Sequence, residues 1–406
     1  MNKKLYTPLL LTFVNVLGFS VLIPILPFII QEYGLSQMWF GILLSSYALS
    51  LFFGAPILGA LSDTFGRKPL LLISQAGTLL CWVIISGSYF IPKSIIIFSF
   101  PLAIFVMLVA RVLDGITGGN NSVVNAYITD ITEPKDRAKS FGLLGATFGI
   151  GFMFGPLIGG LTYKLGFGFL GTSLFATLLS TITLYAIWKY LEEPPRHKTS
   201  QEDWKAHVLA NLNVFSKLYA WRHNQVIASI LTLKFVVILC FTGFTSIISL
   251  YLIDSFNASA TTIGLFLFVI GIYSIVNQMA IVPWMVRTFN ARRTVFIGLV
   301  ILTIGLVIIY FPTNFVIFVI SAYIFSLGIS VINPTVKAIL SNYTEPTKQG
   351  EILGLDEALQ SLSQGIMPLA SSFLYIFFAK AVFFVYALSI CFIAIPLAIR
   401  ALRAEK

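Results

Sequence analysis

The residues best placed to do chemistry are ionisable side chains inside long apolar stretches. They are Arg111, Asp114, Lys234, Asp356 and Glu357. A charge at this position in a bilayer costs at least a few kcal/mol, so such residues pair with one another or mark proton and substrate pathways. The sequence therefore makes these five residues the candidates for proton coupling, with structural ion pairs as the alternative.

Arg111 and Asp114 are three residues apart, so they share one face of an expected helix over 96–128 and can pair. The arginine favours the charged form of Asp114, whereas burial favours the neutral form. A carboxyl under such opposed influences can bind and release a proton, which makes Asp114 a candidate for proton coupling. The alternative is a purely structural ion pair that holds this helix against a neighbour.

A second set of charges lies in the C-terminal half. Lys234 is ten residues into an expected helix over 225–252, and Asp356 and Glu357 lie about two turns into one over 350–377. Consecutive helical residues point about 100° apart, so at most one of these two acids faces a cavity. We expect Lys234 to pair with Glu357 or Asp356, either in proton coupling or as a structural bridge.

The elements that must position these residues are membrane-spanning helices. The chain has 406 residues, of which 57% are hydrophobic and 10% are charged, whereas soluble domains carry about 25% charged residues. Runs of about 20 apolar residues, enough to cross a bilayer, recur along the whole length. The sequence predicts an all-α membrane protein with twelve transmembrane helices, over 7–30, 38–61, 69–90, 96–128, 139–163, 167–190, 225–252, 261–284, 294–311, 314–341, 350–377 and 382–403.

The net charge of +10 reflects the predicted topology. Most of the 26 Lys and Arg fall in loops on one side of these spans, which by the positive-inside rule is the cytoplasmic side. We expect a multi-pass protein of the inner (plasma) membrane with both termini in the cytoplasm. The basic charge therefore predicts contact with the lipid bilayer and no nucleic-acid partner.

The chain divides into two related halves. A hydrophilic stretch over 191–223 separates a six-helix bundle over 1–190 from another over 224–406, and we expect it to be a cytoplasmic linker. Thr132, Glu133 and Pro134 recur 212 residues later as Thr344, Glu345 and Pro346. The same offset also relates residues of the fifth and eleventh helices, namely Gly142 with Gly354, Ala146 with Ala358, Pro156 with Pro368 and Tyr163 with Tyr375. Such repeats with a binding site between them are a known transporter design.

A short motif joins the second and third helices. Gly59 allows close helix packing, Asp63 begins a tight turn, Gly66 supplies permissive dihedral angles, and Arg67 and Lys68 anchor the turn at the headgroups. With Leu61, these residues match the signature G-x-L-x-D-x-x-G-R-K, so the chain resembles the major facilitator superfamily. A degenerate copy over 287–293 lacks both the acid and the glycine.

Two further motifs resemble those of the exporting branch of this superfamily. Arg111, Asp114 and Gly115 are similar to its intramembrane arginine motif. The expected fifth helix carries the antiporter-like pattern G-x8-G-x3-G-P-x2-G-G, in which small residues permit tight packing and the proline permits a kink. Its residues are Gly142, Gly151, Gly155, Pro156, Gly159 and Gly160. The chain most resembles the drug:proton antiporters around the tetracycline exporters.

Amide side chains are the expected lining of the substrate cavity, because they lie on helices that generally line it in this superfamily. One position departs from the tetracycline exporters, which carry an aspartate where this chain has Asn15. Since tetracycline travels as a cationic metal chelate, this change argues against tetracycline as the substrate. The candidate cavity residues are Asn15, Asn120, Asn121, Asn125, Gln278, Asn333, Gln360 and Gln364.

The resemblance implies a proton-coupled secondary transporter that exports small amphipathic compounds by alternating access, functional as a monomer. Alternatives are a transporter of one metabolite (a sugar, siderophore or lipid) or a membrane sensor on the same fold. The sequence holds no Walker-type phosphate loop, no metal-ligand spacing and no nucleophile–base set. We therefore expect no enzymatic activity, no cofactor and no metal, and the partners to be a small molecule and protons.

Overall fold

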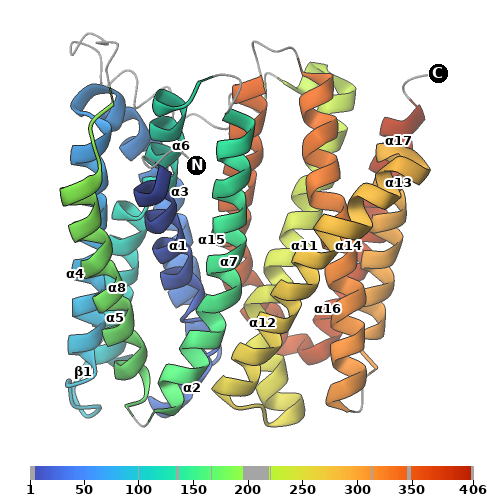
Figure 1. The fold of residues 1–406 in the computed structure, drawn as a ribbon. Helices are drawn as coiled ribbons and strands as arrows, with labels where there is room; N and C mark the ends of the chain where they lie inside the picture. Colours follow the sequence, from blue (N-terminus) through green and yellow to red (C-terminus); the bar gives the residue numbers. More distant parts are fainter. Residues whose placement is uncertain are drawn as a thin grey trace. The chain divides into compact units, whose positions relative to one another are not determined.

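A computed structural model describes residues 5–98, 100–133, 137–165, 167–194, 219, 221–311, 314–344 and 349–403. Nearly all of these residues are helical, and long helices dominate the fold (Figure 1). The described regular structure before residue 194 is α1 (Tyr6–Ser20), α2 (Leu26–Glu32), α3 (Met38–Phe65), α4 (Arg67–Ser88), β1 (Ile96–Ile97), β2 (Phe100–Pro101), α5 (Leu102–Thr117), α6 (Asn120–Ile131), α7 (Arg137–Lys164) and α8 (Phe169–Tyr190).

The rest of the described chain is also helical, with short 3₁₀ and π turns between the longer helices. It contains η4 (Trp221–His223), α11 (Gln225–Phe256), α12 (Ala260–Val276), η5 (Asn277–Ile281), α13 (Val282–Ile308), α14 (Phe315–Tyr343), α15 (Gln349–Phe378), η7 (Ala379–Ala381), α16 (Val382–Ser389), η8 (Ile390–Ala394) and α17 (Ile395–Arg403).

The described residues provide the twelve predicted membrane crossings. Nine helical stretches are long and apolar enough to cross a bilayer. Two of these contain two crossings each, because Ala260–Ile308 turns at the non-helical Asn290 and Ala358–Arg400 turns at Ala379–Ala381. The first crossing is formed by α1 and α2 together. The chain is thus an all-α, multi-pass membrane protein.

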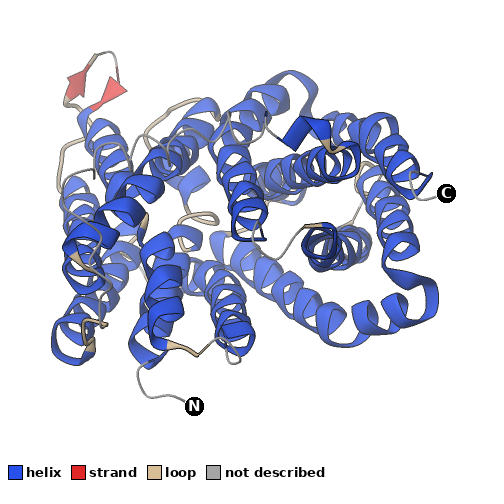
Figure 2. Cartoon of the chain, turned by 90° about the horizontal axis from the view of Figure 1, so that it is seen from above, coloured by secondary structure: helices blue, strands red, loops and turns tan. Residues whose placement is uncertain are grey.

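Two predicted helix boundaries are wrong. The expected helix 7–30 is interrupted by turns over 21–25, because Pro24 lacks a backbone donor and Pro27 starts the new helix α2. The expected helix 96–128 begins only at Leu102. Residues 96–97 instead pair with residues 100–101 as two short antiparallel strands, which Figure 2 shows beside the helices.

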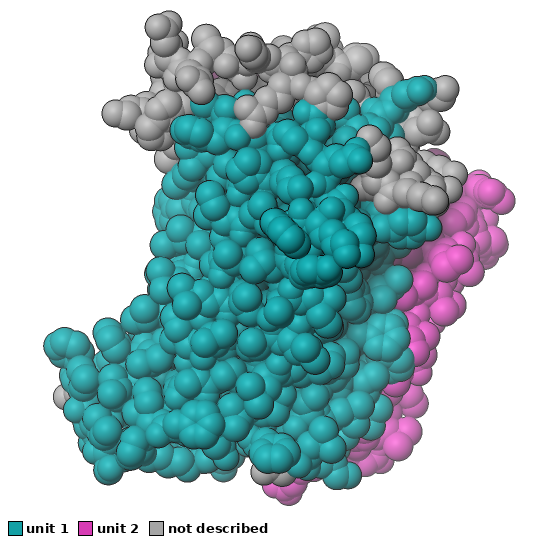
Figure 3. Space-filling view, turned by 60° about the vertical axis from the view of Figure 1, so that its left-hand side comes forward, with its two compact units in different colours: residues 1–213, 259–268 teal, residues 214–258, 269–406 magenta. Residues whose placement is uncertain are grey.

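The chain forms two compact units, coloured separately in Figure 3. The first contains residues 1–213 together with 259–268, and the second contains residues 214–258 and 269–406. The start of α12 therefore packs with α7 of the first unit. The division into bundles over 1–190 and 224–406 with a linker over 191–223 stays a proposal.

Inside the first unit, side chains of several helices form a packed apolar core. A buried cluster joins α1, α4, α6 and α8 through residues such as Leu11, Leu71, Val124 and Ile187. The glycines of α3 and α5 bring these two helices together, since a Cβ on Gly54 or Gly115 would overlap the backbone of the other helix. Such close backbone approach is how membrane helices associate where no hydrophobic driving force acts between them.

Candidate functional site

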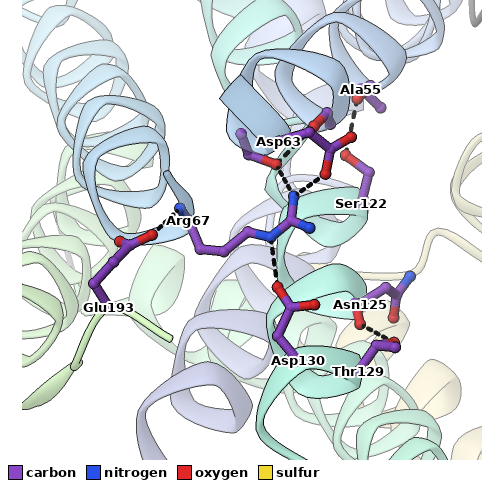
Figure 4. Close-up of polar contacts among 10 residues, drawn as sticks. Ala55, Asp63, Arg67, Ser122, Asn125, Thr129, Asp130 and Glu193 are labelled. Atoms are coloured by element: carbon purple, nitrogen blue, oxygen red, sulfur yellow. Dashed lines mark hydrogen bonds and ion pairs between the residues drawn. The ribbon is translucent and has the colours of Figure 1, made fainter. Parts of the chain in front are cut away.

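The signature motif forms an ion-pair cluster where α3 turns into α4 (Figure 4). Gly66 has φ 110° and ψ 154°, a backbone conformation that is essentially restricted to glycine. The turn brings the Arg67 guanidinium to the Asp63 carboxylate at 2.5 Å and to the Asp130 carboxylate of α6 at 2.9 Å. Gly59 lies beside Ser122 of α6. The motif thus ties α3, α4 and α6 together at one end of the first unit.

Glu193 completes this cluster from a distant part of the sequence. Its carboxylate accepts the backbone N–H of Arg67 at 2.8 Å and that of Lys68 at 2.7 Å (Figure 4). The first N–H groups of a helix have no intrahelical acceptor and carry a partial positive charge, so a carboxylate at this position stabilises the start of α4. Glu193 therefore fastens the chain beyond α8 to the signature turn.

The degenerate copy of the motif keeps the backbone geometry without the glycine. Asn290 has φ 60° and ψ 165°, which lies in the same region of positive φ and extended ψ as Gly66. Its side-chain oxygen accepts the backbone N–H of Arg293 at 3.1 Å, which caps the following helical turns. The repeat is thus conserved in backbone shape although the acid and the glycine are lost.

Arg111 and Asp114 form the predicted pair in α5. Arg111 Nη1 lies 3.0 Å from Asp114 Oδ2, and both side chains are buried. The guanidinium also lies over the Tyr47 ring of α3, 4.2 Å from its centroid. Arg111 Nη2 has no hydrogen-bond partner within the described residues. Ion pairing and cation–π contact thus hold the arginine in a largely apolar environment.

One part of the predicted cavity lining is an amide pair. The Asn15 side chain of α1 donates a hydrogen bond from Nδ2 to the side-chain oxygen Oδ1 of Asn120 in α6 at 2.8 Å. Asn15 Oδ1, Asn120 Nδ2 and Asn121 Oδ1 are buried with no partner among the described residues. Asn120 is fully buried, and Asn125 one turn further along α6 is half-buried. Unsatisfied buried amide groups are rare, so these three atoms mark Asn15, Asn120 and Asn121 as candidates for binding a polar group.

The other predicted amides are spread over the second unit. Gln278 lies in the π turn η5 and donates to Ser274, while Asn333 of α14 is half-buried with an unpartnered Oδ1. On α15, Gln360 is exposed and Gln364 is half-buried. Unlike Asn15 and Asn120, none of these four amides bonds another amide among the described residues.

Lys234 forms the predicted ion pair of the second unit. Its Nζ lies 2.5 Å from Asp356 Oδ2, joining α11 to α15, and both side chains are about 95% buried. Asp356 Oδ1 has no partner within the described part of the chain. Glu357, the alternative partner, lies in α15, but its side chain is outside the described residues. Among those residues, the fully buried charged side chains are Arg111, Asp114, Lys234 and Asp356.

Most glycines of the antiporter-like motif pack against backbone. On α7, a Cβ on Gly151 would meet Phe13 and Val16 of α1, one on Gly155 would overlap Ser20, and one on Gly159 would overlap Val21. Gly142 is different, because nothing lies within 4 Å of where its Cβ would be. Tight helix packing therefore explains Gly151, Gly155 and Gly159 but does not explain Gly142.

The end of this motif contacts α12. The Thr261 hydroxyl donates to the Gly160 carbonyl at 3.0 Å, and the backbones meet at Gly160 with Ala260 and at Gly264 with Pro156. Phe154 and Phe268 pack edge to face with ring centroids 5.3 Å apart. Small residues on both helices thus form one tight seam.

The sequence matches the family model described as Major Facilitator Superfamily over residues 9–272 and again over residues 230–406. The chain belongs to the major facilitator superfamily. The model matches twice, and the second match begins inside the first and continues to the end of the given sequence.

Relatives within the major facilitator superfamily include resistance proteins. The chain is 30% identical to the class C tetracycline resistance protein of Escherichia coli, over 89% of this chain and 87% of that protein. It is 26% identical to the class H tetracycline resistance protein of Pasteurella multocida, covering 92% and 90%. It is 24% identical to the quinolone resistance protein NorA of Staphylococcus aureus, also covering 92% and 90%.

Solved structures share the major facilitator fold at low sequence identity. The human organic anion transporter MFSD10 superposes with a TM-score of 0.70 at 21% identity, covering 98% of this chain and 100% of that chain. A bacterial homologue of the lysosomal transporter Spinster, in an inward-facing state, gives 0.74 at 14% identity, covering 98% and 96%. These similarities support the all-α membrane fold.

Sequence reasoning missed several members of the site. Asp130 and Glu193 bind Arg67 from positions far along the chain, and Tyr47 supports Arg111 through its ring. For Asp130 and Glu193, the only signal in the sequence was an acidic residue near the end of a helix. Many acidic residues near helix ends do not bind a distant arginine. Within the described ranges, no group of three or more His, Cys, Asp or Glu side chains could hold a metal ion.

Proposed function

We propose that this protein is a proton-coupled secondary transporter that exports small amphipathic compounds in exchange for protons. The observation that carries the proposal is the pair of buried cation–carboxylate contacts, Arg111 with Asp114 and Lys234 with Asp356, inside apolar membrane helices. Ionisable groups at such positions are expensive and mark proton or substrate pathways. In each of the two ion pairs the charges cancel. Such a pair suits a transporter that binds one proton on the carboxylate and later releases it.

The relatives support export of drugs. The names of the similar proteins state resistance to tetracycline or to quinolones, and export across the membrane is a direct route to resistance. The glycines of α7 that pack on α1 match the motif of exporting antiporters. This protein accordingly acts as a multidrug efflux transporter rather than as an enzyme, and it needs no cofactor and no nucleic acid.

The proposed mechanism is competition between substrate and proton. Protonation of Asp114 or Asp356 leaves the neighbouring cation unneutralised, so binding of a proton and binding of a cationic or polarised substrate oppose each other. A ligand shifts the balance between inward-open and outward-open states only through its different affinity for the two. Proton binding from outside releases the substrate, and proton loss inside resets the site.

The amides set which compounds bind. The unpartnered groups of Asn15, Asn120 and Asn121 offer both a donor and acceptors, which suits neutral or zwitterionic polar groups. An asparagine at position 15 attracts a cationic chelate less than an aspartate would, because it carries no charge. Amphipathic drugs other than tetracycline are therefore the favoured substrates. Asn125, Gln278, Asn333, Gln360 and Gln364 complete the proposed cavity lining.

The remaining parts of the proposal concern topology. We place the protein in the inner (plasma) membrane with both termini in the cytoplasm, because the Lys and Arg residues concentrate in the loops of one side. The Arg67 cluster then lies at the cytoplasmic surface. The functional unit is a monomer with two six-helix halves, 1–190 and 224–406, joined by the linker 191–223.

The test is proton movement in inside-out vesicles with an acidic interior. Ethidium, norfloxacin and chloramphenicol represent cationic, zwitterionic and neutral compounds, and each is added to vesicles that contain the native protein. We expect at least one compound to release protons from the native vesicles and the release to be lost in Asp114→Asn or Asp356→Asn. Folded native protein that moves no protons with any compound would rule out multidrug antiport and favour a specific metabolite.

A further inference from the structure

The seam between α11 and α15 carries a series of polar contacts along its length. Four side-chain pairs follow one another along these helices and the neighbouring α16: Lys234 with Asp356, Thr242 with Ser363, Ser371 with Tyr386, and Asp254 with Tyr375. Both helices are otherwise strongly apolar. Hydroxyl groups placed in sequence between two acids are the components of a proton path.

One end of the series is the buried ion pair. Asp356 and Lys234 are both nearly excluded from solvent, and Asp356 Oδ1 has no hydrogen-bond partner within the described residues. A carboxylate oxygen without a partner is costly in such surroundings. It is also the atom at which a proton could be received.

The middle of the series consists of hydroxyls. Ser363 donates to the Thr242 hydroxyl at 3.2 Å, and Tyr386 donates to the Ser371 hydroxyl at 2.6 Å. All four side chains are buried. The Tyr386 hydroxyl can approach α11 because Gly243, next to Thr242, has no side chain. A Cβ atom on Gly243 would lie 2.7 Å from that hydroxyl. The Tyr386 hydroxyl and the Met367 methyl group both lie beside Gly243, so the Ser371–Tyr386 pair comes next to the helix turn that carries Thr242.

The other end of the series is open to solvent. The Tyr375 hydroxyl donates to Asp254 Oδ2 at 3.0 Å, and Asp254 is exposed near the C-terminal end of α11. Tyr375 is buried and lies one helical turn beyond Ser371 on α15. An exposed acid bonded to a buried phenol connects the solvent to the interior of the seam.

The spacing of the contacts along α11 nearly equals their spacing along α15. Twenty residues separate Lys234 from Asp254 on α11, and nineteen separate Asp356 from Tyr375 on α15. At 1.5 Å per residue both intervals are about 30 Å, which is the thickness of the hydrocarbon core. The first and the last of the four contacts thus lie about one hydrocarbon thickness apart.

The corresponding seam of the first unit is built differently. There α7 packs on α1 through Gly151, Gly155 and Gly159, and Ser20 donates to main-chain carbonyls rather than to a partner side chain. Tyr163, which the internal repeat relates to Tyr375, has an aromatic contact with Phe28. The two halves of the repeat therefore differ. Helices α1 and α7 pack closely through glycines, whereas α11 and α15 contact each other through hydroxyl side chains.

We infer that the α11–α15 seam is the route by which protons reach Asp356. The inference rests on the proposed proton-coupled function and assigns its proton pathway. A proton from solvent binds Asp254, and each hydroxyl or intervening water accepts one proton on its oxygen and passes its own to the next. One proton leaves the solvent and one arrives on the Asp356 carboxylate, so no charge accumulates between them.

Other titratable groups near the seam define its limits. Cys240 of α11 contacts the Ser389 hydroxyl and the Tyr386 carbonyl, so its thiol points toward α16. Lys337 of α14 and Arg400 of α17 are exposed. The Tyr251 hydroxyl donates to the Ile309 carbonyl, and Tyr251 also interacts electrostatically with Tyr375 of α15. Cys240 and Tyr251 therefore adjoin members of the proposed route, and neither forms one of its four side-chain hydrogen bonds.

The test uses the purified full chain in proteoliposomes, with ethidium, norfloxacin and chloramphenicol as probes. Two rates are compared: proton release on adding a probe under a pH gradient, and exchange of labelled probe at equal pH on both sides. In Tyr375→Phe, Asp254→Asn and Ser371→Ala, we expect proton release to fall about tenfold or more, as for loss of a proton-transfer group. Exchange is expected to stay near the native rate, because it moves no net proton.

A matched control separates the route from general loss of a hydroxyl. Tyr323→Phe in α14 removes a phenol that donates to Asn277 in the same unit but outside the seam, and we expect native rates for it. Native proton release that persists in all three seam variants would overturn the route and leave the proposed function standing. Equal loss of exchange and proton release would also overturn it, since the residues would then act structurally. Native protein without proton release would remove both proposals.

Discussion

At the scale of single residues, Arg111 shows why a charge in a membrane helix needs more than a counter-charge. Its guanidinium binds Asp114 and lies over the Tyr47 ring. Lysine has a compact ammonium that cannot reproduce this contact of a planar guanidinium. We expect Arg111→Lys to lower proton-driven efflux at least about tenfold although it keeps the charge, and Tyr47→Leu to have a similar effect. Transport assays in vesicles check this, and native activity in Arg111→Lys would contradict it.

Lys234 and Asp356 allow stability and coupling to be separated. Removing one partner leaves a buried charge uncompensated, which costs about 3–5 kcal/mol, whereas replacing both by apolar residues is often neutral. We expect Lys234→Met and Asp356→Leu each to lower the melting temperature in detergent, and the double variant to recover it. The double variant should nevertheless stay uncoupled from protons. Recovery of coupling would show that the pair is only structural.

At the scale of elements, the glycines of α7 provide a matched comparison within one motif. Gly155 contacts Ser20 of α1, whereas the space beside Gly142 is open. Overpacking a tight contact costs about 1–3 kcal/mol or more. We expect Gly155→Val to lower both the melting temperature and transport, and Gly142→Val to leave both unchanged. Equal effects of the two substitutions would disprove the packing role.

The two signature turns make a second comparison between elements. Gly66 and Asn290 share a backbone conformation that costs residues other than glycine about 1–3 kcal/mol. Losing the asparagine cap to glycine costs only a few tenths of a kcal/mol. We therefore expect Asn290→Gly to raise the melting temperature and Gly66→Asn to lower it. Thermal unfolding in detergent measures both, and a lower melting temperature for Asn290→Gly would contradict the argument.

The sequence was sufficient to predict the elements but not all of their ends. Apolar length predicts the helices directly, because the bilayer fixes how many residues each crossing needs. The turn over 21–25 and the paired strands at 96–97 and 100–101 depend on how Pro24, Pro27 and Pro101 are used, and apolar composition hides those breaks. Contacts between distant segments, such as Glu193 with the start of α4, depend on tertiary packing and leave no local pattern.

At the scale of the whole molecule, the pairing of charges was easier to predict than their roles. Arg111 with Asp114 follows from helical spacing, and the need of Lys234 for an acidic partner follows from the cost of leaving its charge alone, although the sequence leaves Asp356 and Glu357 both open. The hydroxyl seam was not predicted, because serine and threonine are common in membrane helices and only their alignment between α11 and α15 distinguishes them. The fold therefore follows from the pattern of apolar residues along the sequence. The proposed proton route depends instead on how α11 and α15 are aligned with each other, which the sequence does not reveal.

The central claim is that a proton gradient drives export, and one measurement tests it most directly. Purified protein is reconstituted into proteoliposomes, and accumulation of ethidium, norfloxacin and chloramphenicol is followed after imposing an acidic interior with the membrane potential clamped at zero. The account predicts that at least one probe accumulates, that accumulation stops when an ionophore collapses the pH gradient, and that Asp356→Asn abolishes it. Accumulation that is unchanged after the gradient has been collapsed, or absent for every probe in folded native protein, would contradict the account.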